Sequence, residues 1–445
     1  MIQELRILPP LAIARFGAAP TPMDNYDAVV DPQRPLGYRD LVPAETFEVD
    51  AQSGEIVGTF VPPRVTFTED GNVRPVAPFL EVWALTDGGE LELLTTGLLE
   101  DEGASSSDLQ WRVQVANLKV FRRTSIEADK VSADTGDFSG HGRRTLRGTC
   151  PNFLPGKTIP FGHVQYIKPT DDHPGIRLRF TPAGGFVYGA SRTLAPQAPL
   201  DRNVVDAVYD ARPGRGTWLG YSDEDPGRPT TVPGGIYAQD PPASGISSGY
   251  LDDGCDGVVR LTLTVGGREL SAFGRVGAGP PTYAPDAVPI RTVADELEQA
   301  LFGPSNEPDE ATLERVEEIV RRAFETIRLM NTPAMNEQGN GMAGHDNGAR
   351  RRFEPIMARS LVDEVALENL HESLLVALRS GTAPWFADVL RDYDEIGDLS
   401  DRGRRKMPAL MRGADGRHLT LTRRQIDLIR TLARGPIFAD ENDTP

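Results

Sequence analysis

The sequence predicts an α+β protein in which an antiparallel β-rich body is followed by a helical C-terminal layer. Short alternating apolar runs, each bounded by turn residues, recur until about residue 290, and amphipathic helical patterns follow them. The chain has 45 glycines and 37 prolines in 445 residues, which favours turns and irregular connections over long helices. This length exceeds one small core and suggests two or three domains. The change of pattern near residue 290 divides the chain into residues 1–290 and 291–445.

The strand predictions rest on runs rich in β-branched and aromatic residues. Six such runs are Glu55–Phe60, Phe79–Leu85, Leu91–Thr95, Trp111–Val120, Gly175–Phe180 and Val258–Val265. The stretches LTDGGE (85–90) and TVGGRE (264–269) predict hairpins, because Asp-Gly and Gly-Gly adopt the positive φ angles of tight turns. Between residues 195 and 249, dense Pro, Gly and Asp with little periodicity predict long loops.

The helical patterns begin beyond residue 300. One apolar stripe runs through residues 309–330, and a second helix is expected over 361–378, ended by Gly381. A short third helix is expected at 385–390. The last helix is the best specified, because Thr422 and Gln425 form a capping-box pattern and Gly435-Pro436 ends it. Residues 336–352 are polar and glycine-rich, which predicts a flexible linker.

The charge balance argues against two classes of partner. With 47 basic and 65 acidic residues the net charge is −18, which opposes binding to nucleic acid or to an anionic membrane. Basic runs at 350–352 and 402–406 lack interleaved aromatic residues and are interpreted as surface or partner contacts. The N-terminus lacks the features of a signal peptide, and no apolar run reaches membrane-spanning length. We therefore expect a cytoplasmic, bacterial-type protein.

The stretch GYLDDGCDGVVRLTLTV (249–265) is the most distinctive candidate site. Asp252, Asp253 and Asp256 are candidate ligands for a divalent cation, but an EF-hand count from Asp252 places Gly254 third and Leu263 twelfth, so that pattern fails. The Asp-Gly pairs favour successive turns in which the aspartates cap backbone N–H groups. Cys255 lies among these acids, which would raise the pKa of its thiol and make it a poor nucleophile.

The remaining candidates lack the context that their chemistry needs. Cys150 and Cys255 are expected to be buried, reduced thiols. His141, His163 and His173 have no metal-binding spacing, although a cluster assembled in space stays open. GISSG (245–249, with Ser247 central) lacks the strand before and the helix after that a nucleophile elbow requires, and GNGMAG (339–344) lacks a preceding strand. No catalytic or cofactor-binding residue is predicted.

Several motifs, taken in order, resemble one family. They are RILPPLAIARFGAAP, LQWRVQVANLKVF, HGRRTLRG with HVQYIKPTDDHPGIRLRFTPAGG, the acidic stretch above, GPPTYAPD, and MPALMRGADGRHLTLTRRQIDLIRTLARGPIF. Together they are similar to segments of the quinoprotein amino-acid oxidases, the LodA-like family of lysine ε-oxidase and glycine oxidase. Gln114 stands where that family has histidine, and Cys255 where it has serine. The resemblance implies a shared scaffold, with the acidic stretch as one of its structural turns.

The resemblance also implies a cofactor whose motifs are absent here. Family enzymes carry a cysteine tryptophylquinone, formed by crosslinking a Cys to a Trp in the region after the last matching helix. This chain ends about ten residues beyond that helix. Its cysteines, Cys150 and Cys255, and its tryptophans, Trp83, Trp111, Trp218 and Trp385, have no matching context. We therefore expect no such cofactor in this chain, and no catalytic residue is carried over.

Three functional hypotheses follow. The first is a non-catalytic homologue, acting as a scaffold or as an accessory subunit with a protein partner or as a homo-oligomer. The second is a divergent oxidoreductase acting on amino acids or amines, with another cofactor or with a catalytic region from a partner chain. The third is an unrelated β-rich binding module. The residues favour the first.

Overall fold

The computed structural model describes residues 1–29, 39–124, 127–191, 204–210, 236–239, 247–281, 290–307, 310–328, 372–373, 375–381, 384–390, 392, 411–412, 418–419 and 421–434. The chain forms two compact units. One unit contains Met1–Asp27 and Val42–Tyr283, and the other contains Ala28–Leu41 and Ala284–Pro445. No sequence pattern predicted that Ala28–Leu41 would group with the second unit.

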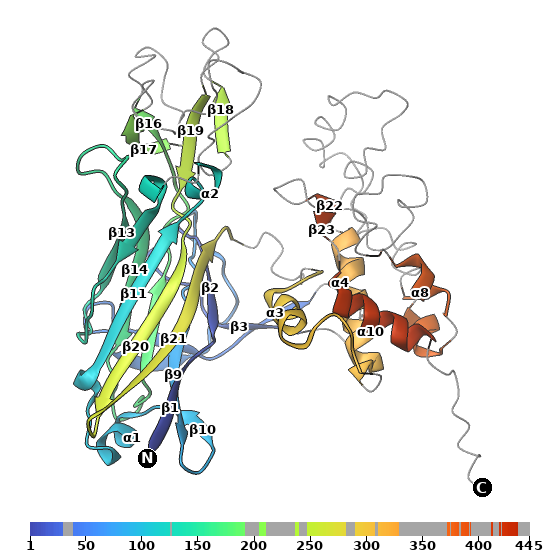
Figure 1. Ribbon diagram of the computed structural model, residues 1–445, viewed down its shortest axis with the longest axis horizontal. Coiled ribbons are helices and arrows are strands. Elements are labelled where there is room, and N and C mark those ends of the chain that lie inside the picture. Colours follow the sequence, from blue (N-terminus) through green and yellow to red (C-terminus); the bar gives the residue numbers. More distant parts are fainter. Residues whose placement is uncertain are drawn as a thin grey trace. The chain divides into compact units, whose positions relative to one another are not determined.

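The first unit contains two large sheets packed face to face (Figure 1). One sheet has the strand order β1-β9-β15-β14-β13, with β10 also paired to β9, and all its pairs are antiparallel. Its strands are β1 (Ile2–Leu8), β9 (Phe79–Thr86), β10 (Leu91–Leu93), β13 (Arg144–Gly148), β14 (Ile159–Ile167) and β15 (Arg177–Thr181).

The other large sheet has the order β12-β11-β20-β21-β2. Its strands are β2 (Leu11–Arg15), β11 (Leu109–Asn117), β12 (Val131–Asp134), β20 (Asp256–Val265) and β21 (Arg268–Gly279). All neighbours are antiparallel except β2 and β21, which are parallel. We call the side of this five-stranded sheet that faces away from the core its outer face.

Strict alternation of side chains builds the core between the two sheets. Along β11 every second residue is buried, and Trp111 is fully buried. The Trp111 ring meets the ring of Tyr166 on β14 of the other sheet, with 5.8 Å between centroids. Burying large apolar side chains from both sheets supplies the main favourable free energy of this unit. The antiparallel β-rich body predicted from the sequence is confirmed.

Both predicted hairpins are present. Thr86 donates its N–H to Glu90 across the β9–β10 turn at 3.1 Å, and β20 continues directly into β21 with Val265 opposite Arg268. Gly266 and Gly267 in that second turn have φ angles of 56° and 77°, which glycine adopts without steric cost.

The expectation of loops alone between residues 195 and 249 was wrong. A four-stranded sheet of order β17-β16-β19-β18 draws three of its strands from this stretch. Its strands are β16 (Val187–Ser191), β17 (Val204–Asp210), β18 (Ile236–Gln239) and β19 (Ser247–Asp252). The sequence VVDAVYD of β17 has clear β propensity, and its Val208 and Tyr209 are buried. The surrounding Pro and Gly residues concealed these short strands.

Smaller elements complete the first unit and the segments beside it. Three two-stranded sheets pair β3 (Tyr26–Val29) with β4 (Asp40–Pro43), β5 (Thr46–Val49) with β6 (Ile56–Phe60), and β7 (Thr68–Glu69) with β8 (Asn72–Val73). Two short helices are α1 (Thr96–Asp101) and α2 (Phe121–Thr124).

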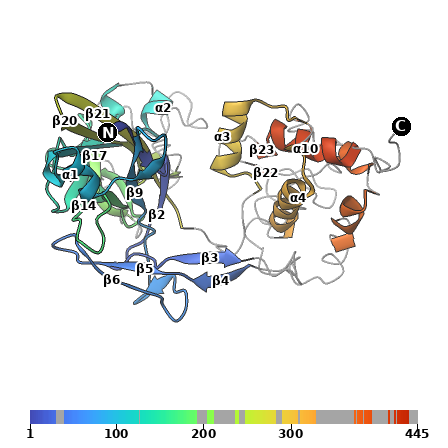
Figure 2. The same ribbon diagram turned by 90° about the horizontal axis from the view of Figure 1, so that it is seen from below.

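The second unit is helical, as predicted. Its described elements are α3 (Val293–Phe302), α4 (Leu313–Arg328), α8 (Phe386–Val389), α10 (Arg423–Arg434) and the strand pair β22 (Met411–Arg412) with β23 (His418–Leu419) (Figures 1 and 2). The apolar stripe of α4 and the buried face of α10 share one core, which includes Val316, Val320 and Ile429. Among the residues that the structure describes, no helix has the length and apolar composition that crossing a bilayer requires.

The helix ends follow their capping signals. The box at α10 is confirmed, since Thr422 N donates to Gln425 Oε1 at 2.8 Å and Gln425 N donates to Thr422 Oγ1 at 3.1 Å. Helix α3 was not predicted, although Thr292 and Asp295 form a second capping box there. Of the helix expected at 361–378, the described residues 372–373 and 375–378 are helical. The linker 336–352, GNGMAG, both basic runs and Gly435-Pro436 lie outside the described residues.

Candidate functional site

The acidic turn that precedes β20 forms hydrogen bonds and an ion pair with two distant segments, the end of β11 and residues 185–186. Asn117 donates through Nδ2 to the Asp252 carbonyl oxygen at 3.0 Å and to Asp252 Oδ1 at 3.2 Å. Lys119 forms an ion pair with the same carboxylate, and Gly254 N donates to Asp252 Oδ1 at 3.0 Å. Asp252 therefore caps its own turn, as predicted, and also holds the end of β11.

Asp253 fastens a second segment from a buried position. Its side chain is fully buried, and Oδ2 accepts hydrogen bonds from Gly185 N at 3.1 Å and Phe186 N at 2.9 Å. The other oxygen, Oδ1, has no hydrogen-bond partner among the described residues. Burial raises the pKa of Asp253 to about 6, because loss of hydration outweighs the two backbone N–H groups that favour the charged form.

Five of the ordered sequence motifs meet at this turn. Phe16 from the first motif packs between glycines of two others: a Cβ added at Gly185 would lie 3.0 Å from Phe16 Cβ, and one at Gly254 would lie 3.3 Å from Phe16 Cζ. Phe16 N also donates to the Gly279 carbonyl at 2.9 Å, where the GPPTYAPD motif begins. We call this meeting point of Asp252, Asp253 and Phe16 the acidic-turn junction.

Both cysteines are buried free thiols. Cys255 is 6% exposed, and burial followed by the nearby Asp256, Asp253 and Asp252 carboxylates raises the pKa of its thiol far above the usual range. Cys150 is also buried, and burial raises its pKa to about 11. Both thiols therefore stay protonated at neutral pH.

The histidines lie in separate surroundings. The His141 ring contacts Tyr166, with 4.5 Å between centroids, and the His173 ring contacts Phe47 at 5.4 Å. Burial, followed by the positive charges of Arg143 and Arg179, lowers the pKa of His163 to about 4. Within the described ranges, no three His, Cys, Asp or Glu side chains are arranged to hold a metal ion, and Asp252, Asp253 and Asp256 are no exception.

The GISSG pattern does not form a nucleophile elbow. Ser247 is the first residue of β19, which runs from Ser247 to Asp252 and pairs with β18, so no helix follows it. The preceding residues 240–246 lie outside the described part of the chain.

A hollow of about 360 Å³ lies on the outer face of the five-stranded sheet, next to the acidic-turn junction. Its floor is one cross-strand row, in which Ile13, Gly277, Asp256 and Ala116 lie opposite one another on four adjacent strands. Because Gly277 and Ala116 have little or no side chain, the sheet surface dips there. Leu11 and Leu118 add apolar walls. We call this space the outer-face hollow.

The outer-face hollow carries positive charge in an acidic chain. Its described lining includes Arg15, Lys119 and Arg122 but only one carboxylate, Asp256. Arg122 and Asp256 are 68% and 64% exposed, and the shortest distance between their charged atoms is 3.9 Å, so they form only a weak pair. Arg15 donates to the Pro280 carbonyl at 3.3 Å. This lining suits a ligand that carries negative charge.

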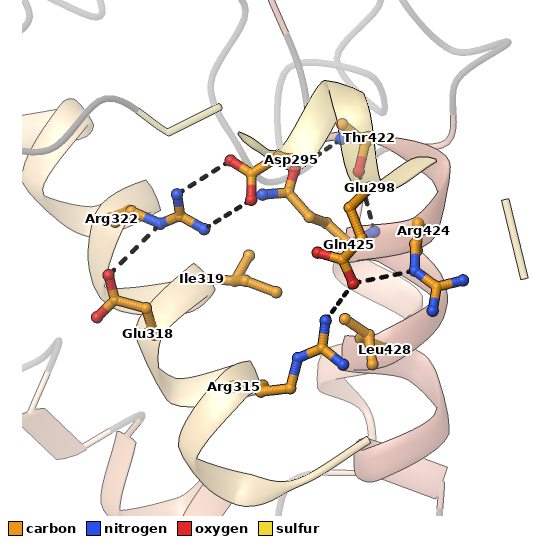
Figure 3. A pocket seen from close by; sticks show the side chains of 10 residues that line it. All are labelled: Asp295, Glu298, Arg315, Glu318, Ile319, Arg322, Thr422, Arg424, Gln425 and Leu428. Atoms are coloured by element: carbon orange, nitrogen blue, oxygen red, sulfur yellow. Dashed lines mark hydrogen bonds and ion pairs between the residues drawn. The ribbon is translucent and has the colours of Figure 1, made fainter. Parts of the chain in front are cut away.

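A second pocket lies among α3, α4 and α10 of the helical unit (Figure 3). Its volume is about 130 Å³, and we call it the three-helix pocket. Arg322 of α4 forms a two-pronged ion pair with Asp295 of α3, at 3.0 and 3.2 Å. Glu298 of α3 binds both Arg315 of α4 and Arg424 of α10.

The acidic turn was predictable from the sequence, but neither cavity was. The outer-face hollow forms only when four strands bring their row into register, and the one local signal was the glycine-rich stretch GRVGAG at the end of β21. The three-helix pocket depends on Asp295 and Glu298 of the helix that was missed.

Comparison with known proteins finds similar solved structures. No family model matches this chain, and no curated protein does. Among solved structures, the chain is similar to the L-Lys epsilon-oxidase from Marinomonas mediterranea, at 16% identity with a TM-score of 0.45. It is also similar to the structure of that enzyme's Schiff base intermediate with L-Lys, at 15% identity with a TM-score of 0.46. A further structure of the enzyme matches at 15% identity with a TM-score of 0.47. Each match covers 97% of this chain but 61% of the other, so the chain spans under two thirds of that enzyme's length.

Proposed function

We propose that this protein is a non-catalytic binding subunit, a scaffold or accessory partner, whose outer-face hollow recognises a carboxylate attached to a short apolar group. The observation that carries the proposal is the combination of three cations with an apolar floor in one hollow of about 360 Å³. Small-molecule sites begin at about 300 Å³ and typically join apolar walls to a few well-placed polar groups. No cofactor within this chain is part of the proposal.

The charge distribution supports an anionic ligand. Three cations outnumber the lining carboxylate Asp256 and the Asp252 carboxylate that pairs with Lys119, so positive charge remains in excess there, although the chain as a whole carries −18. The guanidinium groups of Arg15 and Arg122 match the planar geometry of a carboxylate. Leu11, Ile13 and Leu118 then remain for an alkyl group. The carboxylate has two sources: a free short-chain acid, or the C-terminal residue of a partner polypeptide.

The chemistry of the hollow supports binding rather than catalysis. The thiol that borders it, Cys255, is buried and has a strongly raised pKa, so it supplies no nucleophile at neutral pH. The remaining charged lining residues are two arginines, a lysine held by Asp252, and an exposed aspartate near Arg122. Such groups position an anion.

Isothermal titration of the full chain with butyrate and with its neutral isostere butanamide tests the proposal. Butyrate is expected to bind at least ten-fold more tightly than butanamide. Gly277→Val is expected to abolish binding without unfolding the sheet, because a Cβ at Gly277 meets no atom within 4 Å. Arg260→Gln is the matched control, since Arg260 is an exposed cation of β20 that does not line the hollow.

The source of the carboxylate is distinguished with a peptide ending in leucine, compared with the same peptide amidated at its C-terminus. Tighter binding of the free-acid peptide than of butyrate indicates a partner chain, and equal binding indicates a small acid. Binding of butanamide as tight as that of butyrate, or butyrate binding that survives Gly277→Val, would falsify the proposal.

One observation favours a second candidate, a divergent oxidoreductase acting on amino acids or amines. Asp253 has a pKa of about 6 and one oxygen without a partner among the described residues, which are properties of a general base. Intact mass and a visible spectrum of protein from its native source, with a peroxide assay on amines and amino acids, test this candidate. An unmodified mass, no visible band and no turnover favour the binding subunit.

A further inference from the structure

We propose that the three-helix pocket is a second binding site, for a small uncharged molecule that carries a carbonyl oxygen and a short alkyl group. This inference does not depend on the outer-face hollow, which lies in the other unit and prefers negative charge. It rests on one buried donor, on the charge balance of the lining and on the size of the pocket.

The donor is the side-chain amide of Gln425 on α10. The residue is 3% exposed, and its Oε1 accepts the capping hydrogen bond from Thr422 N at 2.8 Å. Its Nε2 has no hydrogen-bond partner among the described residues. In Figure 3 this amide nitrogen points to the side where Arg322 and Ile319 of α4 lie. A buried N–H group without a partner costs free energy, which a ligand with an acceptor oxygen would recover.

The lining sets the charge of the ligand. Three guanidinium groups, those of Arg315, Arg322 and Arg424, face three carboxylates, those of Asp295, Glu298 and Glu318. Burial acts to raise the pKa of Asp295, but hydrogen bonds from Arg322 and Thr292 outweigh it and hold that pKa below its usual range. The ionised network therefore has no net charge. A charged ligand would enter without a counter-ion, whereas an uncharged one avoids that cost.

The pocket also sets the size and shape of the ligand. Its volume of about 130 Å³ is close to that of an engineered cavity of about 150 Å³ that holds benzene, which suggests roughly four to six non-hydrogen atoms. Ile319 and Leu428 offer an apolar wall for the alkyl part. A primary amide of three carbons has the required acceptor and the required length.

The test uses propanamide, propanoate and propylammonium as probes of nearly equal shape, with binding to the full chain followed by ligand-observed NMR titration. Propanamide is expected to bind at least ten-fold more tightly than propanoate. Gln425→Glu keeps the oxygen that caps α10 but removes the amide donor and adds a negative charge. It should therefore lose propanamide binding by about ten-fold and gain binding of propylammonium, which an unfolded variant would not do.

Leu428→Phe fills the pocket and is expected to abolish propanamide binding, with hydrogen exchange of α10 confirming that the helix remains. Gly277→Val, in the other unit, is the matched control and should leave propanamide binding unchanged. The inference is overturned if propanoate binds as well as propanamide, or if Gln425→Glu leaves the preference among the three probes unchanged.

Discussion

The stability of the Asp253→Asn variant, compared with that of the wild type at the same pH, should increase as the pH rises. The carboxyl group is fully buried, and its pKa is raised from 3.8 to about 6. It therefore binds its proton more tightly in the folded chain than in the unfolded chain. The bound proton therefore adds to the free energy of unfolding. This contribution is complete below pH 3.8 and is lost progressively as the pH rises to about 6.

The magnitude follows from the size of the shift. A rise from 3.8 to about 6 is roughly two units, and each unit corresponds to about 1.4 kcal/mol, so the charged carboxylate costs the fold roughly 3 kcal/mol at neutral pH. Asn at this position presents an oxygen to Gly185 N and Phe186 N but never ionises. Between pH 4 and pH 7.5, the free energy of unfolding of the variant should therefore rise by roughly 3 kcal/mol relative to that of the wild type.

Hydrogen exchange of peptides from β19 and β20 measures this difference locally, which matters because the two units need not unfold together. Wild type and variant are compared at the same pH, so the intrinsic dependence of exchange on pH cancels. Asp256→Asn is the control, because it removes an exposed carboxylate from the same turn. A difference between Asp253→Asn and wild type that is the same at pH 4 and pH 7.5 would refute the reasoning.

Three further predictions concern stability and reactivity. Gly277→Ala should leave the free energy of unfolding nearly unchanged, because a Cβ there meets no atom within 4 Å. Gly257→Ala should lower it by about 2 kcal/mol or more, because its Cβ would lie 2.0 Å from the Gln114 carbonyl oxygen. Thermal unfolding of the two variants checks this, and equal melting temperatures would contradict it. Arg74→Met should destabilise the first unit by about 3–5 kcal/mol, because it leaves the mostly buried Asp24 carboxylate without its partner. The Arg74 side chain is 7% exposed, and its guanidinium lies 2.6 Å from Asp24 and 3.2 Å from the Thr66 carbonyl oxygen. A midpoint of chemical denaturation equal to that of the wild type would count against this prediction. Cys150 and Cys255 should react with a thiol reagent at pH 8 only after unfolding, and rapid labelling of the native chain would show that burial is not what controls them.

The local features of the fold were predictable because their causes lie within a few residues. The hairpin turn at Gly266 and Gly267 and the capping box at Thr422 and Gln425 each depend on contacts between near neighbours. The strands β17 and β18 were missed although they pair with strands that are near in the chain, β16 and β19. They have only seven and four residues, and the Pro- and Gly-rich composition around them outweighed this weak β signal.

The sequence predicted that residues 252–257 form turns, but it did not predict which distant residues Asp252 and Asp253 bind. Asp252 binds Asn117, which is 135 residues away in the chain, and Asp253 binds Gly185, which is 68 residues away. Neither partner has a spacing from which the contact can be inferred. The outer-face hollow has the same origin, because the absence of a side chain at Gly277 acquires meaning only when Ile13 and Asp256 are placed on either side of it.

Lys119 connects the outer-face hollow to Asp252 of the acidic-turn junction, and this leads to a last prediction. The Lys119 ammonium group lines the hollow but forms an ion pair with Asp252, so a carboxylate ligand must compete with Asp252 for it. Arg15 and Arg122 would then make the primary contacts. Asp252→Asn should release Lys119 toward the hollow and strengthen butyrate binding several-fold, since one exposed ion pair contributes up to about 1 kcal/mol.

The same substitution leaves an amide oxygen for Asn117 and Gly254, so the turn keeps its capping hydrogen bonds. The double variant Asp252→Asn with Lys119→Met is the control, and it should lose the gain in affinity because no released cation remains. Titration with butyrate measures both. If Asp252→Asn weakens binding, the role of Asp252 in holding the end of β11 outweighs its competition for Lys119, and the hollow depends on an intact junction for its shape.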